Sequence, residues 1–237
     1  MNKEELSVKR DAEEFAHKNR IAIAKRLTDT QVFLPDAFPV SVFMAGSPGA
    51  GKTESSRHLI KRLTKDTYAV LRIDPDELRS EFSEYNGHNS SLFIGATSII
   101  ADRMHDLALK NKQSFVFDGT LSNLERSRQN LERSLRRDRF VQIVYVYQDP
   151  LQAWNFVKAR EVRDGRSVPK EAFIGQYFTA RNNVNLLKQE FGAKIKVDLV
   201  VKNNDGTDLN YCENIESVDG YIPEKYTTEV LEKIIIL

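Results

Sequence analysis

Short apolar runs alternate with longer amphipathic segments along most of the chain. The apolar runs span residues 40–45, 68–73, 114–117, 140–147 and 196–201. They are rich in Val, Ile, Phe and Tyr and are continuous rather than alternating in polarity, which is typical of strands that are covered on both faces. We therefore predict five buried β-strands.

The segments between these strands repeat apolar residues at the spacing of amphipathic helices. They span residues 51–63, 92–110, 122–136, 151–163 and 169–191. This alternation of strands and helices predicts an α/β fold with a doubly wound, mainly parallel sheet that is flanked by helices.

The two ends of the chain extend this pattern. Residues 4–27 carry a loose apolar stripe amid charges and are predicted to be helical, whereas two prolines make residues 32–40 a connector. We expect residues 1–38 to form this N-terminal helix and connector, and residues 39–237 to form the main domain. The tail at residues 208–237 is expected to add a small hairpin and a last helix.

Composition places the chain among ordinary globular proteins. Of its 237 residues, 41% are hydrophobic and 29% are charged, and the net charge is +1, so no global field recruits long nucleic acid or a membrane. The single cysteine, Cys212, excludes an intramolecular disulfide and a cysteine zinc site. The first residues lack the apolar core of a secretion signal, and we expect a cytoplasmic protein.

A glycine-rich loop that matches the pattern G-x-x-x-x-G-K-[ST] follows the first strand. It comprises Gly46, Ser47, Pro48, Gly49, Ala50, Gly51, Lys52 and Thr53. Glycines let consecutive N–H groups turn inward around an anion, and the next helix presents its positive end to the same phosphates. Lys52 is expected to neutralise the outer phosphates and Thr53 to hold Mg²⁺. The motif predicts a P-loop NTPase-like fold that binds ATP, in preference to GTP, with Mg²⁺.

Acidic residues follow the second predicted strand, in the order Asp74, Pro75, Asp76, Glu77. One interpretation is structural, since Asp74 would cap a helix, Pro75 would take its first position and Glu77 would complete a capping box. The other is catalytic, since Asp76 lies where a carboxylate could accept the proton of an attacking hydroxyl. The residues alone leave both interpretations open for Asp76.

The third predicted strand ends in Asp118, Gly119 and Thr120. A carboxylate directly after a buried strand has the form of a Walker-B residue, which supplies oxygen to Mg²⁺ or to its water shell. An ordinary Asp-Gly turn is the alternative. The pairing with a P-loop favours the metal site.

Three arginines lie close together near residue 163. Arg160 and Arg163 are one helical turn apart, and the turn at Gly165 would bring Arg166 back to the same region. Arginines folded over a phosphate site on a mobile lid stabilise the charge that develops during phosphoryl transfer. A solvated helix end is the alternative interpretation.

Other conspicuous residues are interpreted as structural. The arginines between residues 126 and 139 are balanced by acidic neighbours and are interpreted as surface residues. Trp154 lies on a predicted helix and is interpreted as a core residue. The four histidines show no metal-ligand spacing.

Read in order, these motifs resemble the zeta toxin family of P-loop kinases, which are found in bacterial toxin–antitoxin modules. The resemblance covers about residues 40–207. It rests on the P-loop, the I-D-x-D element at residues 73–76, the Asp-Gly-Thr element at 118–120, Arg160 with residues 166–169, and the turn at 203–206.

The resemblance implies an activity. Known members phosphorylate a sugar hydroxyl of UDP-N-acetylglucosamine and so starve cell-wall synthesis, which implies a growth-inhibiting kinase with a nucleotide-sugar substrate. By similarity, Lys52 and Thr53 would hold ATP and Mg²⁺, and Asp76 would be the base on the sugar hydroxyl. Arg160 and Arg166 would grip the transferring phosphate. An antitoxin protein is the partner implied.

The resemblance also assigns roles to further positions, and at several of them this chain differs from the residue that the family usually has. Asn204 would edge the adenine pocket. Asp102, Asp118 and Thr120 would contact the substrate, although the family usually has the longer Glu at the first two. Ser122 stands where the family often has arginine, and Arg126 is the nearest basic residue. These departures concern the acceptor rather than ATP.

Alternatives remain beside this hypothesis. One is a P-loop kinase for another acceptor, such as an antibiotic, a nucleoside or a polynucleotide 5′ end, although the near-neutral charge counts against long polynucleotides. A nucleotide-gated interaction protein is a non-enzymatic alternative, but a pure switch would not need Asp76 together with the arginines. The N-terminal helix either packs across the sheet, which we favour, or covers the active site as a built-in restraint.

Overall fold

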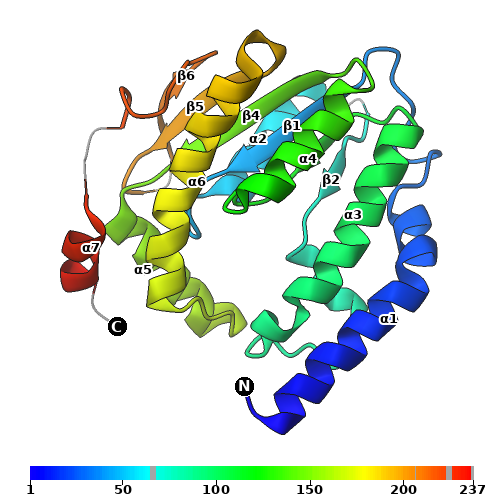
Figure 1. Cartoon of the computed structure of the whole chain (residues 1–237), viewed down its shortest axis with the longest axis horizontal. Helices are drawn as coiled ribbons and strands as arrows, with labels where there is room; N and C mark the ends of the chain where they lie inside the picture. Colours follow the sequence, from blue (N-terminus) through cyan, green and yellow to red (C-terminus); the bar gives the residue numbers. More distant parts are fainter. Residues whose placement is uncertain (65–67, 206, 223–225, 236–237) are drawn as a thin grey trace.

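A computed structural model describes residues 1–64, 68–205, 207–222 and 226–235. Six strands form one sheet in the order β2-β3-β1-β4-β5-β6 (Figure 1). They are β1 (Val40–Ala45), β2 (Leu71–Ile73), β3 (Phe115–Phe117), β4 (Phe140–Tyr147), β5 (Lys196–Lys202) and β6 (Asp208–Cys212). Strands β1 to β5 are parallel, and only β6 among these six runs antiparallel, against β5. The predicted doubly wound, mainly parallel sheet is confirmed.

Helices cover both faces of this sheet (Figure 1). The α-helices are α1 (Lys3–Leu27), α2 (Lys52–Thr64), α3 (Ile94–Lys110), α4 (Leu124–Leu135), α5 (Pro150–Asp164), α6 (Lys170–Phe191) and α7 (Thr228–Ile234). Successive side chains of β1 face opposite sides of the sheet and belong to two different apolar clusters. Phe43 and Ala45 join the larger apolar cluster with residues of α3, α4, α5 and α6, whereas Val42 and Met44 join a smaller cluster against α2.

Most predicted elements are found, with shifted ends. Strand β2 begins at Leu71, not at residue 68, and the side chain of Tyr68 is exposed. Helix α4 begins two residues later than predicted because the side chain of Asn123 accepts a hydrogen bond from the Arg126 N–H and so caps the helix. The expected tail is present, with β6 completing a hairpin with β5 and α7 closing the described chain.

The interpretation of Asp74 as a cap is confirmed for the turn after β2, where its carbonyl accepts hydrogen bonds from the N–H groups of Glu77 and Leu78, but no α-helix follows. Residues after β2 form only a short 3₁₀ helix, η1 (Glu77–Glu81). Asp74 accepts a hydrogen bond of 2.8 Å from the N–H of Asp76, and Glu77 turns its carboxylate toward Arg57 and Arg72. Glu77 therefore does not complete a capping box, because the arginines compete for its charge.

Helix α1 is packed into the body of the protein along α3 (Figure 1). A capping box of Asn2 and Glu5 starts it, and Ala12, Ala16 and Ile23 are buried in the main apolar cluster. Its main neighbour is α3 rather than the sheet, which differs from the packing that we expected. Small residues on both helices allow this close approach.

The interpretation of the arginines at 126–139 as surface residues is wrong for Arg139. Its side chain is buried and donates hydrogen bonds to the Ser41 hydroxyl and to the carbonyl groups of Val40 and Gln113. It ties the starts of β1 and β4 to the segment between α3 and β3. Trp154 is buried, as predicted.

Candidate active site

The loop between β1 and α2 has the geometry of a phosphate cradle. Gly46, Gly49 and Gly51 have φ values of +136°, +76° and +87°, which residues with a Cβ rarely adopt. A Cβ at Gly46 would collide with the carbonyl oxygen of Val146, and one at Gly49 with that of Ala153. The loop is thus wedged between β4 and α5, at the positive N-terminal end of α2, where a triphosphate binds in P-loop proteins.

Lys52 bends back over this loop. Its ammonium donates hydrogen bonds of 3.0 Å and 2.6 Å to the carbonyl oxygens of Gly46 and Ser47. Burial lowers the pKa of Lys52 to about 8, although nearby Asp118 and Asp76 partly offset this. The lysine, both carboxylates and Arg160 are therefore close enough to act on one another electrostatically.

A second lysine supports the cradle, which sequence reasoning missed. Lys202, at the end of β5, is only 3% exposed and pairs with Asp208 at 2.6 Å. Its Cε would lie 3.2 Å from a Cβ built on Gly51, so its stem packs directly against the phosphate loop. Asn204, the expected adenine contact, is exposed just beyond it, and Gly206 of the same turn lies outside the described residues.

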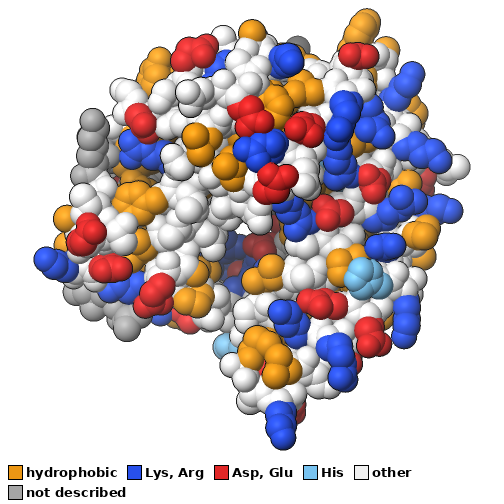
Figure 2. Space-filling view, viewed as in Figure 1, with side chains coloured by type: hydrophobic (Ala, Val, Ile, Leu, Met, Phe, Trp, Pro, Cys, Tyr) orange, Lys and Arg blue, Asp and Glu red, His pale blue; other side chains and the backbone are white. Residues whose placement is uncertain are grey.

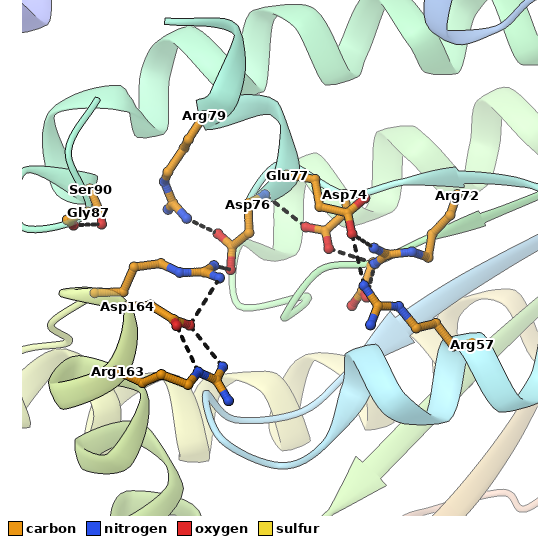
Figure 3. A network of polar contacts seen from close by, with 12 residues as sticks. Arg57, Arg72, Asp74, Asp76, Glu77, Arg79, Gly87, Ser90, Arg163 and Asp164 are labelled. Atoms are coloured by element: carbon orange, nitrogen blue, oxygen red, sulfur yellow. Dashed lines mark hydrogen bonds and ion pairs between the residues drawn. The ribbon is translucent and has the colours of Figure 1, made fainter. Parts of the chain in front are cut away.

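Asp76 lies between arginines from two different segments (Figure 3). One carboxylate oxygen pairs with Arg79 of η1, and the other accepts a hydrogen bond of 3.2 Å from Arg166. Burial would raise the pKa of Asp76, but Arg79, Arg166 and Arg160 outweigh it and hold the pKa below its usual value. The lowered pKa keeps the carboxylate ionised. Because 46% of its side chain is exposed, the carboxylate is also accessible.

The three lid arginines behave differently from one another. Gly165 forms the predicted turn, in a left-handed conformation, and Arg166 after it contacts Asp76. Arg160 acts electrostatically on both Lys52 and Asp76. Arg163 instead pairs with Asp164, and its side chain is 72% exposed. We call residues 160–166 the arginine lid.

Arg72 organises the carboxylates at the ends of β2 and β3. One of its nitrogens donates hydrogen bonds to Asp74 at 2.6 Å and to Asp118 at 2.8 Å, and another pairs with Glu77 (Figure 3). Burial and the repulsion of Asp118 and Asp76 raise the pKa of Asp74 to about 6, against the opposing effect of Arg72. Arg72 therefore compensates charges that would otherwise repel one another.

A pocket of about 170 Å³ opens beside Pro75, the residue before Asp76, and is lined mainly by β3, the loop after it, α3 and α4. Its floor is apolar, with Phe43 and Phe117, and its rim is polar, with Thr120 and Arg126. Asp102 is joined to this rim because Arg126 pairs with it at 2.8 Å. Figure 2 shows the surface of this face hollowed at its centre, with acidic and basic side chains inside the hollow.

The residues at the cradle fit a nucleotide with Mg²⁺. In P-loop kinases this ion takes few protein ligands besides phosphates and water. Thr53, at the start of α2, and Asp118 are the candidates, and the contacts of Asp118 with Arg72 and Ser56 both fall on Oδ2, which leaves Oδ1 for the ion or its waters. Among the described residues, no group of three or more His, Cys, Asp or Glu forms a metal site by itself.

Sequence reasoning missed several residues of the site. Arg79 follows Asp76 by three positions, a spacing that brings side chains together on any helical turn. Arg72 was detectable as a lone charge inside an apolar strand. Lys202 had no local signal that links it to the site, because its neighbours come from distant segments. Arg126 was indicated only by the family resemblance, as the basic residue nearest to Ser122.

Fold and site together define the class of protein: the chain is a P-loop kinase, an enzyme that transfers phosphate from ATP to a hydroxyl. A family model described as zeta toxin matches residues 23–216. The chain therefore belongs to the zeta toxin family.

Solved structures with a similar fold include two from other systems. One belongs to the PezAT chromosomal toxin–antitoxin system of Streptococcus pneumoniae, with 15% identity, a TM-score of 0.61, and coverage of 93% of this chain and 86% of that one. Another is the AvrRxo1-ORF1:AvrRxo1-ORF2 complex with ATP, with 16% identity, a TM-score of 0.65, and coverage of 89% and 71%. A search of curated proteins finds no match. Among the described helices, none combines the length and apolarity needed to cross a membrane.

Proposed function

We propose that this protein transfers the γ-phosphoryl group of ATP to a hydroxyl of a nucleotide sugar, with UDP-N-acetylglucosamine as the family's precedent, and thereby inhibits growth. The observation that carries the proposal is the position of Asp76. Its ionised carboxylate lies between Arg79 and Arg166 and within electrostatic range of Lys52. Its neighbour in the chain, Pro75, lines the same pocket as Thr120 and Arg126.

In the proposed reaction, Asp76 orients the acceptor hydroxyl and takes up its proton as the oxygen–phosphorus bond forms and ADP departs. A carboxylate with a lowered pKa is a weak base, which suits a loose transition state in which the proton leaves late. Lys52, Arg160 and Arg166 supply positive charge to the phosphoryl group. Thr53 and Asp118 would hold Mg²⁺, which would supply positive charge to neutralise the phosphates.

A nucleotide sugar suits the pocket for chemical reasons. Its diphosphate needs a cation, and Arg126, with 38% of its side chain exposed, is available on the rim. Its hydroxyls need polar partners, which Thr120 and Ser122 provide. Asp102 holds Arg126 in place, so the shorter carboxylate contributes through the arginine in this proposal.

We further propose that a separate antitoxin protein restrains the enzyme. The PezAT system pairs a toxin with an antitoxin. Helix α1 is committed to α3 through buried residues, which argues against its use as a removable inhibitor.

The decisive experiment incubates the purified protein with Mg·ATP and a panel of nucleotide sugars and measures product masses. We expect a gain of one phosphate on UDP-N-acetylglucosamine, which Asp76→Asn and Lys52→Met abolish. Asp138→Asn, an exposed change of the same type, should remain active. Binding of ATP without phosphorylation of any nucleotide sugar would overturn the assignment of the acceptor.

A further inference from the structure

The loop between η1 and the 3₁₀ helix η2 (Ser90–Phe93) lies directly against the arginine lid. Gly87 has a φ of +89°, and a Cβ there would collide with the carbonyl oxygen of Asp164. A Cβ on Gly165 would in turn lie 3.1–3.2 Å from three atoms of the His88 ring. The two segments therefore touch backbone to backbone and ring to backbone, without room for a methyl group.

The loop itself is firmly held on the α3 side of the site. Asn86 and Asn89 exchange hydrogen bonds between side chain and N–H at 3.1 Å and 3.2 Å, and the Asn89 amide donates to the Glu84 carbonyl at 2.8 Å. Ser90 donates from both its N–H and its hydroxyl to the Gly87 carbonyl (Figure 3). This network makes the loop a rigid support, which we call the ledge (residues 84–90).

The contact of Gly87 and His88 with the arginine lid lies where the chain leaves α5, directly before Arg166. Gly165 is the left-handed C-cap of α5, so its backbone sets the direction in which the chain leaves the helix. Arg166 follows at once, with Asp76 at 3.2 Å and Asp164 at 3.8 Å. A shift of the lid away from the ledge would move this guanidinium off the carboxylate.

We propose that Gly87 and His88 are positioning residues, which keep the arginine lid docked so that Arg166 stays over Asp76 before any substrate binds. The absence of a side chain at Gly87 allows the close approach, and the ring of His88 fills the space over Gly165. The part of this proposal that concerns catalysis rests on the proposed kinase function, whereas the docking itself does not.

Hydrogen–deuterium exchange of the full chain tests the docking independently of activity. Gly87→Ala should speed exchange of amides at residues 163–168 by about tenfold, because the lid opens locally. Gly192→Ala is the matched control, since Gly192 also has a positive φ, of +54°, and a Cβ there meets nothing within 4 Å. His88→Ala adds no atoms and should give a smaller change in the same direction even if Gly87→Ala fails to fold. Unchanged exchange in a folded variant would overturn the proposal.

Kinetics test the consequence for catalysis. Gly87→Ala should lower kcat at least tenfold, since a displacement of about 1 Å is enough for such a loss. The acid limb of the pH–rate profile should also move to higher pH, which a merely structural defect would not cause. The charged groups that face Asp76 are Arg79 on η1, Arg160 and Arg166 on the lid, Lys52 on α2 and Asp74 after β2.

Exchange and kinetics together distinguish the docking of the arginine lid from the assignment of a nucleotide sugar as acceptor. Faster exchange without turnover of any nucleotide sugar, even in the unaltered protein, would support the docking and reject the assigned acceptor. Turnover with an unmoved acid limb in Gly87→Ala would reject the ledge as a positioning element.

Discussion

The guanidinium of Arg166 donates a hydrogen bond of 3.2 Å to the carboxylate of Asp76, which lies 90 residues earlier in the chain. The two residues come from different segments, Arg166 from the chain after α5 and Asp76 from the chain after β2. Their contact brings the arginine that would stabilise the transferring phosphate to the carboxylate that would bind the acceptor hydroxyl. Together with Arg79, it also holds the pKa of that carboxylate below its usual value, against the effect of burial.

Replacement of Arg166 should therefore affect both rate and pH dependence. We expect Arg166→Gln to lower kcat by about 10³-fold, the scale found for arginines that stabilise phosphoryl transfer. Asp76 must be ionised to accept a proton, and activity falls as the pH falls through its pKa. Because Arg166 lowers that pKa, its removal should shift the acid limb to higher pH in a steady-state profile.

Arg163→Gln is the control for this change. It removes the same charge three residues away, from a side chain that is turned to solvent and paired with Asp164. Equal losses in both variants would show that general positive charge, rather than the contact with Asp76, matters.

Lys52 gives a prediction for ATP binding. Its pKa of about 8 means that the ammonium is mostly charged at pH 7 and increasingly neutral above pH 8. A triphosphate favours the charged form, so binding should take up a proton at about pH 8.5 and little at pH 7. Calorimetry in buffers with different ionisation enthalpies measures this uptake, and the terminal phosphate of ATP is already fully ionised at the higher pH. Equal uptake at both values would contradict the lowered pKa.

Lys202 should increase the affinity for ATP although it lies outside the P-loop motif. Its stem packs on Gly51 and its ammonium is fixed by Asp208. We expect Lys202→Ala to raise the KM for ATP about tenfold while kcat changes less, because the cradle loses its support. Lys196→Ala, on the exposed start of the same strand, should leave both constants near those of the unaltered protein.

How much of this could be read from sequence depends on how local each determinant is. The P-loop was predictable because its glycines, Lys52 and the start of α2 are contiguous, and the turn at Gly165 predicted the return of Arg166. Asp74 caps the turn after β2, as its place in the sequence suggested, but Arg72, on the preceding strand, attracts Glu77 away from the position that a capping box requires. Propensity describes an isolated segment, and here an ion pair overrides it.

The remaining features depend on contacts between distant segments. No pattern within residues 84–90 shows that Gly87 will meet the carbonyl of Asp164, since either glycine alone is typical of an ordinary turn. Likewise, Arg126 belongs to a run of balanced charges, and only the packing of α4 against α3 brings it to the rim of the pocket with Asp102. Such residues become visible only when the fold brings the segments together.

The role of α1 can be tested with a variant that distinguishes a contribution to the stability of the protein from inhibition of the enzyme. Ala16 is fully buried in the main apolar cluster, whereas His17, the next residue, is exposed. Ala16→Asp should lower the free energy of unfolding by about 3 kcal/mol or more, because it buries a charge without a partner, and His17→Asp should change it little. Urea denaturation measures this difference.

If α1 were instead a built-in inhibitor, loosening it would raise kinase activity in Ala16→Asp under conditions where the protein stays folded. We expect no such rise, because the buried side chains of α1 support α3, which lines the pocket, so that loosening the helix should lower activity together with stability.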